Sequence, residues 1–325
     1  MEKLLQELGF AKPEVVKGRY SVADLFKPKD RSGIYVLHFE NGQFYVGLAT
    51  DFVRRYNQHR KNHLDIELVS FKKVKKEKLA VEEKMIVQTL QLEGYSLRNI
   101  QLVSIIEGDT DLDLLMSVDE QEQFMFDLTF NNMGGDKFEI EEQRIKYTNN
   151  YNALTKLSYF ERYIEAVKVY VNIGIPIPKK TEYSFWCISN PSGNTKLSRI
   201  NVYWQEVATF IFDKDDFYIT FHLAYSPLAD EYGDELDGLF EQFESLEIMF
   251  NDKDEIHTYE PGGQDQISFF IPSSIFHSFI SLEAVQKAIR IFNLRLMRKG
   301  ATIFNRYHSF DLSRKIFNIE SIPSV

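Results

Sequence analysis

One short hairpin, residues 32–47 with the sequence SGIYVLHFENGQFYVG, most constrains what this chain can fold into. Two runs rich in β-branched and aromatic residues flank an Asn-Gly pair, which is a strong signal for a tight β-hairpin. The first run carries Tyr35 and the second carries Tyr45. The turn sets the strand register, and the register decides whether the two tyrosines share one face of the sheet.

Two turn geometries are open for this hairpin. A two-residue turn at the Asn-Gly pair would place Tyr35 and Tyr45 on opposite faces, where one site could not readily use both. A three-residue loop ending in a left-handed Gly42 would shift the register by one residue. Tyr35 would then face Gly47, and Tyr45 would face Leu37. We predict the three-residue loop or an equivalent bulge, with the other face of the hairpin carrying Val36, His38, Phe44 and Val46.

The rest of the chain predicts an α+β fold in several segments. After the hairpin, residues 50–63 are spaced as a helix capped by Thr50 or Asp51, residues 65–74 alternate as a strand, and residues 77–94 form a helix that a glycine ends. We expect an N-terminal helix and connector over 1–29, a small α/β (α+β) domain over 30–105 and a helical connector over 106–178. Two prolines then mark the boundary to a β-rich α+β domain over 179–325, which contains a strong helix from Leu282 to Lys299.

Charge and composition bound the function. The net charge of −10 argues against nucleic acid as a partner of the whole chain. However, residues 1–100 carry a net charge of +5 and the remainder carries −15, so only the first third can face a polyanion. No run of about eighteen apolar residues occurs, so we expect a soluble, cytoplasmic protein with no membrane partner. The single cysteine, Cys187, excludes an internal disulfide and a cysteine-based zinc site.

Residues downstream of the hairpin extend the two tyrosines into a candidate reactive site. Arg55 and His59 are four residues apart on a predicted helix, so both point the same way. Glu82 lies on the next helix, and Asn99 lies just past its end. A carboxylate that holds a metal, a cation, and a phenol or imidazole that takes a proton from water suffice for phosphodiester hydrolysis.

In this order and spacing, residues 30–105 resemble the GIY-YIG nuclease family. Gly33-Ile34-Tyr35 matches the first signature of the family and Tyr45-Val46-Gly47 matches the second. The later positions match its helix arginine, its His/Tyr position, its metal-binding glutamate and its closing asparagine, in the order Arg55, His59, Glu82 and Asn99.

The resemblance implies a three-stranded antiparallel sheet, one Mg²⁺ or Mn²⁺ ion held by Glu82, and DNA cleavage with a signature tyrosine as general base. We prefer Tyr45 over Tyr35 for that role, with His59 relaying protons or orienting the tyrosine. The spacing to Met85 and Ile86 favours Glu82 over the adjacent glutamate as the metal ligand. Arg55 would bind the scissile phosphate, and Asn99 would brace the site.

Basic residues near the site are candidate contacts to the DNA backbone, although a solvated edge or loop is the alternative for the lysine cluster FKKVKKEK. These candidates are Arg54, Arg60, Lys61, Lys72, Lys73, Lys75 and Lys76. Many members of the family carry a lysine where this chain has Leu48. Without that cation, Arg55 and the metal would carry more of the phosphate charge.

We therefore expect a metal-dependent DNA endonuclease, with restriction or defence against foreign DNA as its setting. The alternative is a cleavage-poor nucleic-acid-binding or regulatory protein on the same fold, which Leu48 and the acidic C-terminal part favour. The net charge of −15 suits protein contacts better than DNA contacts. We expect residues 106–325 to mediate self-association, bind a protein partner or restrain the nuclease.

Overall fold

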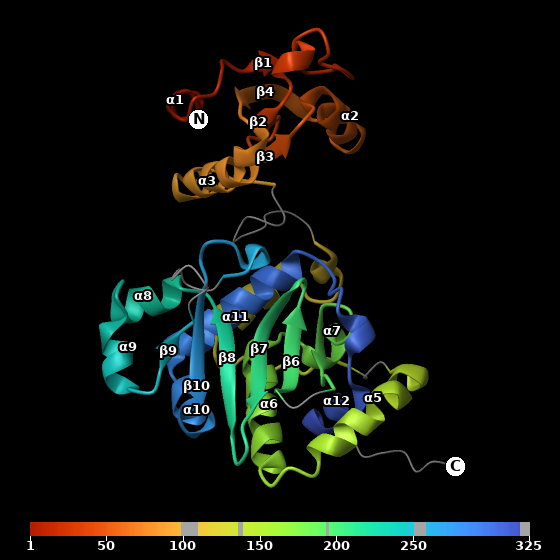
Figure 1. The fold of residues 1–325 in the computed structure, drawn as a ribbon, viewed down its shortest axis with the longest axis vertical. Helices are drawn as coiled ribbons and strands as arrows, with labels where there is room; N and C mark the ends of the chain where they lie inside the picture. Colours follow the sequence, from red (N-terminus) through yellow and green to blue (C-terminus); the bar gives the residue numbers. More distant parts are fainter. Residues whose placement is uncertain (99–109, 136–138, 193–194, 250–257, 319–325) are drawn as a thin grey trace. The chain divides into compact units, whose positions relative to one another are not determined.

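The computed structural model describes residues 1–98, 110–135, 139–192, 195–249 and 258–318. The chain divides into two compact units, residues 1–108 and 109–325 (Figure 1). Each unit combines helices with an antiparallel sheet, so the expected α+β class is confirmed. No helix of the described residues is long and apolar enough to cross a membrane.

The first unit is built around a four-stranded antiparallel sheet in the order β1-β4-β2-β3. The family resemblance implied three strands, and the additional one is the two-residue β1, which pairs with the outer edge of β4. The described elements are α1 (Glu2–Glu7), β1 (Glu14–Val15), η1 (Pro28–Asp30), β2 (Gly33–Phe39), β3 (Phe44–Ala49), α2 (Phe52–Asn62), β4 (Ile66–Lys73), η2 (Lys76–Lys78) and α3 (Leu79–Leu92).

The register of the β2–β3 hairpin confirms the three-residue loop. Tyr35 pairs with Gly47, and Leu37 pairs with Tyr45. The backbone of Gly42 is left-handed, with a φ of 82°, which costs a glycine little. Both tyrosines therefore lie on one face of the sheet.

The two faces of this sheet pack against different helices. On one face, Ile34, Val36 and Val46 contact the buried side of α3. On the other face, Tyr35 and Leu37 belong to a cluster with residues of α2. Asp51 rather than Thr50 caps α2, because its side chain accepts a hydrogen bond from the backbone of the first helical turn. The sheet thus holds the tyrosines against α2, as the site requires.

The second unit contains a six-stranded antiparallel sheet in the order β5-β6-β7-β8-β10-β9 (Figure 1). Its helical elements are η3 (Asp111–Leu114), α4 (Val118–Phe126), α5 (Glu141–Leu154), α6 (Phe160–Gly174), α7 (Pro178–Thr181), α8 (Ser226–Tyr232), α9 (Asp237–Gln242), η4 (Glu260–Gly262), α10 (Ser273–Ile280), α11 (Glu283–Arg298), η5 (Asn305–Tyr307) and α12 (Phe310–Ile316). Its strands are β5 (Trp186–Ser189), β6 (Lys196–Val202), β7 (Gln205–Phe212), β8 (Phe217–Leu223), β9 (Glu247–Ile248) and β10 (Ile267–Pro272).

The segment expected as a separate helical connector belongs to the core of this second unit. Helix α6 packs against the sheet, with Tyr163 beside Phe217 and Tyr170 stacked on Phe221. These rings are fully buried and lie in one hydrophobic cluster with α11. Pro178 is the first residue of the short helix α7, and Pro176 lies just before that helix. Both prolines lie inside the second unit and so do not mark a boundary between the two units. The expected helix from Leu282 to Lys299 is confirmed as α11.

Candidate active site

Two glycines allow close approaches around the paired tyrosines, Gly47 to their rings and Gly33 to the neighbouring strand β4. The rings of Tyr35 and Tyr45 are nearly parallel, with their centroids 6.2 Å apart. A Cβ atom on Gly47 would lie 2.4 Å from the hydroxyl oxygen of Tyr35, a distance that no side chain tolerates. A Cβ on Gly33 would lie 2.1 Å from the carbonyl oxygen of Lys72. Both signature glycines thus have a steric reason to be glycine.

Helix α2 brings a base and a cation to the buried phenol of Tyr35. The hydroxyl of Tyr35 lies 2.7 Å from Nε2 of His59. Nε of Arg55 donates to the same hydroxyl at 3.4 Å. The His59 ring also contacts Tyr45, at 4.7 Å between centroids. The four residues expected to act together, two tyrosines, one arginine and one histidine, do lie together.

Burial fixes the protonation states of this group. It lowers the pKa of His59 to about 4, with the charge of Arg55 acting in the same direction. It raises the pKa of Tyr35 well above its usual value, and it raises that of Tyr45 against the opposing effect of Arg55. At neutral pH the imidazole is therefore neutral and both phenols are protonated. The hydroxyl of Tyr35 and Nε2 of His59 share one hydrogen bond, and in the tautomer with an unprotonated Nε2 the imidazole accepts the phenol proton.

The carboxylate that lines the cleft of the tyrosines is Glu83, and not the Glu82 that the sequence favoured. The backbone N–H of Leu48 on β3 donates to Oε1 of Glu83 at 3.0 Å, and Glu83 lines the same cleft as the tyrosines. Glu82 does not line that cleft. It instead forms an ion pair with Lys72, at 2.6 Å. The physical reason is the phase of α3, which turns Glu83 towards the edge of the sheet.

These groups line an open cleft of about 520 Å³. Tyr35, Tyr45, Arg54, Arg55 and Glu83 all contribute to it. Sequence reasoning missed several other lining residues, which are Ala49, Thr50, Asp51 and Gln58. The cleft therefore combines two arginines, two phenols and the carboxylates of Glu83 and Asp51. Leu48 also lines it, at the position where many GIY-YIG members carry lysine.

Among the remaining basic candidates, three lysines are exposed and two others form ion pairs with carboxylates. Lys61, Lys75 and Lys76 are exposed. Lys72 is paired with Glu82, and Lys73 is paired with Asp30 at 2.6 Å. These two lysines would have to exchange a protein carboxylate for a phosphate to bind DNA.

Arg60 is not a DNA contact, which corrects the sequence expectation. Its side chain is only 6% exposed. One guanidinium nitrogen donates to the backbone carbonyls of Leu64 and Ile66, at 2.9 and 3.2 Å. It therefore fixes the turn between α2 and β4.

The expected brace, Asn99, lies outside the described residues. Its neighbour Arg98 ties the hairpin to the rest of the unit. The guanidinium forms a bidentate pair with Asp65, at 2.7 and 3.3 Å, and lies 3.6 Å above the ring of Phe39. Its backbone N–H donates to Phe44 at 2.7 Å. Arg98 thus connects the end of the first unit to both strands of the β2–β3 hairpin and to Asp65 before β4.

The carboxylate of Glu83 could help to hold one hard divalent cation. Among the described residues no group of three or more His, Cys, Asp or Glu side chains could enclose a metal. Mg²⁺ is commonly held by one or two carboxylates together with waters and substrate phosphate oxygens. The oxygen donor of Glu83, beside a cleft lined by two arginines, matches that requirement.

Comparisons with family models, with curated proteins and with solved structures find no match for this chain. The functional argument therefore rests on the residues and their geometry.

Proposed function

We propose that the first unit is a metal-dependent DNA endonuclease of GIY-YIG type. The observation that carries the proposal is the convergence of Tyr35, Tyr45, Arg55 and Glu83 on one cleft, with His59 in contact with both tyrosines. These residues come from two strands and two helices, and packing alone does not require their grouping. Each supplies a chemical group that phosphodiester hydrolysis needs.

The arginines provide the phosphate site. Arg54 and Arg55 line the cleft and are both exposed, so their guanidinium groups are accessible to a DNA phosphate. Charge-assisted hydrogen bonds from arginine to phosphate are among the strong ones in proteins. As the attacking water forms its bond to phosphorus and the bond to the leaving oxygen breaks, Arg55 stabilises the added negative charge.

A relay from Tyr35 to His59 provides the base. A protonated phenol takes a proton from water effectively only if it passes its own proton on. The neutral Nε2 of His59, 2.7 Å from the Tyr35 hydroxyl, is placed to accept that proton. Tyr35 is fully buried, whereas Tyr45 is half-buried at the cleft. Tyr45 is therefore the phenol that can contact the attacking water, and Tyr35 links it to His59.

Glu83 would hold the Mg²⁺ or Mn²⁺ ion. When bound, the ion would act as a Lewis acid on the phosphate. The hydrogen bond from Leu48 to Glu83 fixes the orientation of the carboxylate at the edge of β3. The ion and the two arginines together would take over the charge that a lysine at the position of Leu48 supplies in many family members.

Nicking of a supercoiled plasmid by the full-length chain, with Mg²⁺ or Mn²⁺ and with a chelator as control, tests the proposal. We expect metal-dependent nicking that Tyr35→Phe and Arg55→Ala strongly reduce. Retention of DNA without any cleavage, under either metal, would refute the enzyme and favour the binding protein considered as the alternative. Cleavage that both variants leave unchanged would place the activity elsewhere in the chain.

A further inference from the structure

The second unit contains a cavity of about 340 Å³ that the proposed nuclease chemistry does not use. Its polar lining, which we call the floor, includes Arg199 and Asn201 of β6, Glu206 of β7 and Asn190 just after β5. Its aromatic lining, which we call the walls, consists of Tyr147 on α5 with Phe304 and Tyr307 at η5. The volume lies in the lower part of the roughly 300–1,000 Å³ range of small-molecule sites.

The polar residues of the floor include one ion pair that a ligand can reach. A terminal guanidinium nitrogen of Arg199 lies 3.0 Å from Oε1 of Glu206, and the two side chains are 36% and 20% exposed. The pair makes the floor close to neutral. It also offers a ligand further guanidinium N–H donors beside a carboxylate acceptor.

The rim combines aromatic rings with cations. Tyr307 is 42% exposed, and the guanidinium of Arg306 lies 4.8 Å from the centre of its ring. At the other tyrosine, Nζ of Lys146 lies 5.1 Å from the centre of the Tyr147 ring. The cavity therefore offers flat apolar surfaces close to its mouth and positive charge outside it.

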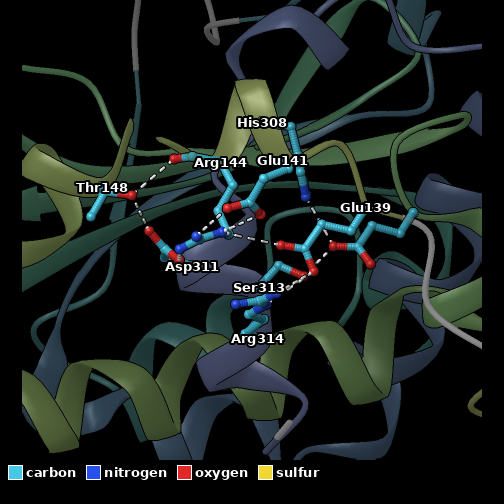
Figure 2. A network of polar contacts seen from close by, with 9 residues as sticks. Glu139, Glu141, Arg144, Thr148, His308, Asp311, Ser313 and Arg314 are labelled. Atoms are coloured by element: carbon cyan, nitrogen blue, oxygen red, sulfur yellow. Dashed lines mark hydrogen bonds and ion pairs between the residues drawn. The ribbon is translucent and has the colours of Figure 1, made fainter. Parts of the chain in front are cut away.

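Hydrogen bonds hold the two aromatic walls together. The hydroxyl of Tyr147 donates to the backbone carbonyl of Arg306 at 2.9 Å. On the same helix, Arg144 and Thr148 both bind Asp311 of α12, at 3.1 and 2.7 Å (Figure 2). The network in Figure 2 thus fixes α5 on both sides of Tyr147. A site whose walls are already positioned loses less free energy on binding.

We propose that this cavity binds a single unstacked nucleobase, with its sugar and any phosphate at the rim. Aromatic side chains bind bases by stacking. Adjacent donors and acceptors on the edge of a base match the guanidinium donors of Arg199 and the carboxylate acceptor of Glu206. The neutral floor suits an uncharged ring, while Arg306 and Lys146 suit a phosphate outside the cavity. The site is separate from the cleft of the first unit and does not depend on the proposed nuclease activity.

The same base chemistry is available from a free nucleoside or nucleotide and from an unpaired base in a nucleic acid. Isothermal titration calorimetry of the full-length chain with the four ribonucleosides and their 5′-monophosphates tests binding of a free nucleoside or nucleotide. The same titration with a short single-stranded DNA tests binding of an unpaired base in a nucleic acid. Saturable binding in the first set identifies a free ligand, whereas binding of the oligonucleotide alone identifies a nucleic-acid base.

Two variants and a matched control locate the binding. Tyr307→Ala removes a partly exposed wall and is expected to weaken the affinity about 5- to 150-fold, the range for loss of one base–aromatic stack. Arg199→Met removes the floor donor and should weaken it as well. Tyr232→Ala, a half-exposed tyrosine on α8 outside the cavity, should leave it unchanged.

No one-to-one binding from either source would overturn the proposal. So would binding that neither Tyr307→Ala nor Arg199→Met weakens, or that Tyr232→Ala weakens equally. Glu83→Gln, which changes the cleft of the first unit, should leave base binding intact. The two proposals can therefore fail independently.

Discussion

The position of the carboxylate on α3 gives the sharpest prediction, because two adjacent glutamates have different surroundings. Glu83 lines the cleft of the tyrosines, whereas Glu82 pairs with Lys72. We expect Glu83→Gln to reduce metal-dependent nicking about 10²- to 10³-fold, the size of loss when one group that stabilises transition-state charge is removed. Glu82→Gln is the matched control and should change nicking little.

The substitution to glutamine separates chemistry from folding. A glutamine at position 83 keeps an oxygen that can accept from the Leu48 N–H, now at 3.0 Å from Glu83, so the strand edge stays paired. The ion pair of Glu82 with Lys72 is half-buried, and its loss should cost at most about 1 kcal/mol of stability. Circular dichroism during urea unfolding checks that both variants are folded.

Initial nicking rates on supercoiled plasmid, measured over a range of Mg²⁺ concentrations, provide the assay. A loss that higher Mg²⁺ partly restores in Glu83→Gln would support a ligand function. If Glu82→Gln is inactive while Glu83→Gln is active, the placement of the metal at Glu83 is refuted. If both variants cut at the wild-type rate, the cleft is not the site of cleavage.

Four further predictions follow from the geometry. Gly47→Ala should abolish nicking and destabilise the protein by at least about 1–3 kcal/mol, because its Cβ would overlap a buried phenol; thermal unfolding measures this. Burial lowers the pKa of His59 to about 4, so its ring should stay neutral between pH 7 and 5 in an NMR titration. Protonation of the ring below pH 5 should remove nicking activity. A midpoint near 6.5 for this ring would contradict the prediction. Replacing Lys75 and Lys76 by glutamate should weaken DNA binding. It should also reduce the slope of log affinity against log salt concentration by the amount expected for about two lost phosphate contacts. An unchanged slope would show that neither lysine contacts the DNA. A fragment of residues 1–108 should fold alone, and it should nick plasmid faster than the whole chain if the second unit restrains the nuclease. If the fragment has the nicking rate and the oligomeric state of the whole chain, the second unit neither restrains the nuclease nor mediates self-association.

The hairpin and its register could be predicted from sequence because local chemistry determines them. An Asn-Gly pair and the alternation of the flanking strands leave only two registers, and the need to bring two tyrosines to one site chooses between them. The helices of the first unit were equally accessible, since Asp51 at the start of α2 and the glycine after α3 mark their ends.

The preference for Glu82 rested on its spacing to Met85 and Ile86, but only Ile86 of these two is buried on α3. Met85 is 41% exposed, whereas Leu79, Ile86, Val87 and Leu90 are buried. Position 83 lies four residues after Leu79 and four before Val87, so it belongs to the inward-facing stripe. That stripe was present in the sequence and could have identified Glu83.

Other features depend on contacts that no local pattern contains. Arg60 resembles its basic neighbours in sequence, and only the fold shows that backbone carbonyls surround it. Strand β1 has two residues, which is too short for any periodicity to reveal. The cavity of the second unit joins Tyr147, Asn190 and Tyr307, and such distant residues meet only through the tertiary structure.

The hydrogen bond from the backbone N–H of Leu48 to the carboxylate of Glu83 also affects the solubility of the first unit. Strand β3 lies at the edge of the sheet, and exposed edges invite pairing with another chain and aggregation. Glu83 occupies the N–H of Leu48 near one end of this edge, and Phe44 at the other end is bridged to Leu97. A variant that shortens Glu83 would uncover part of the edge, so its loss of activity would come with a tendency to form filaments or precipitate.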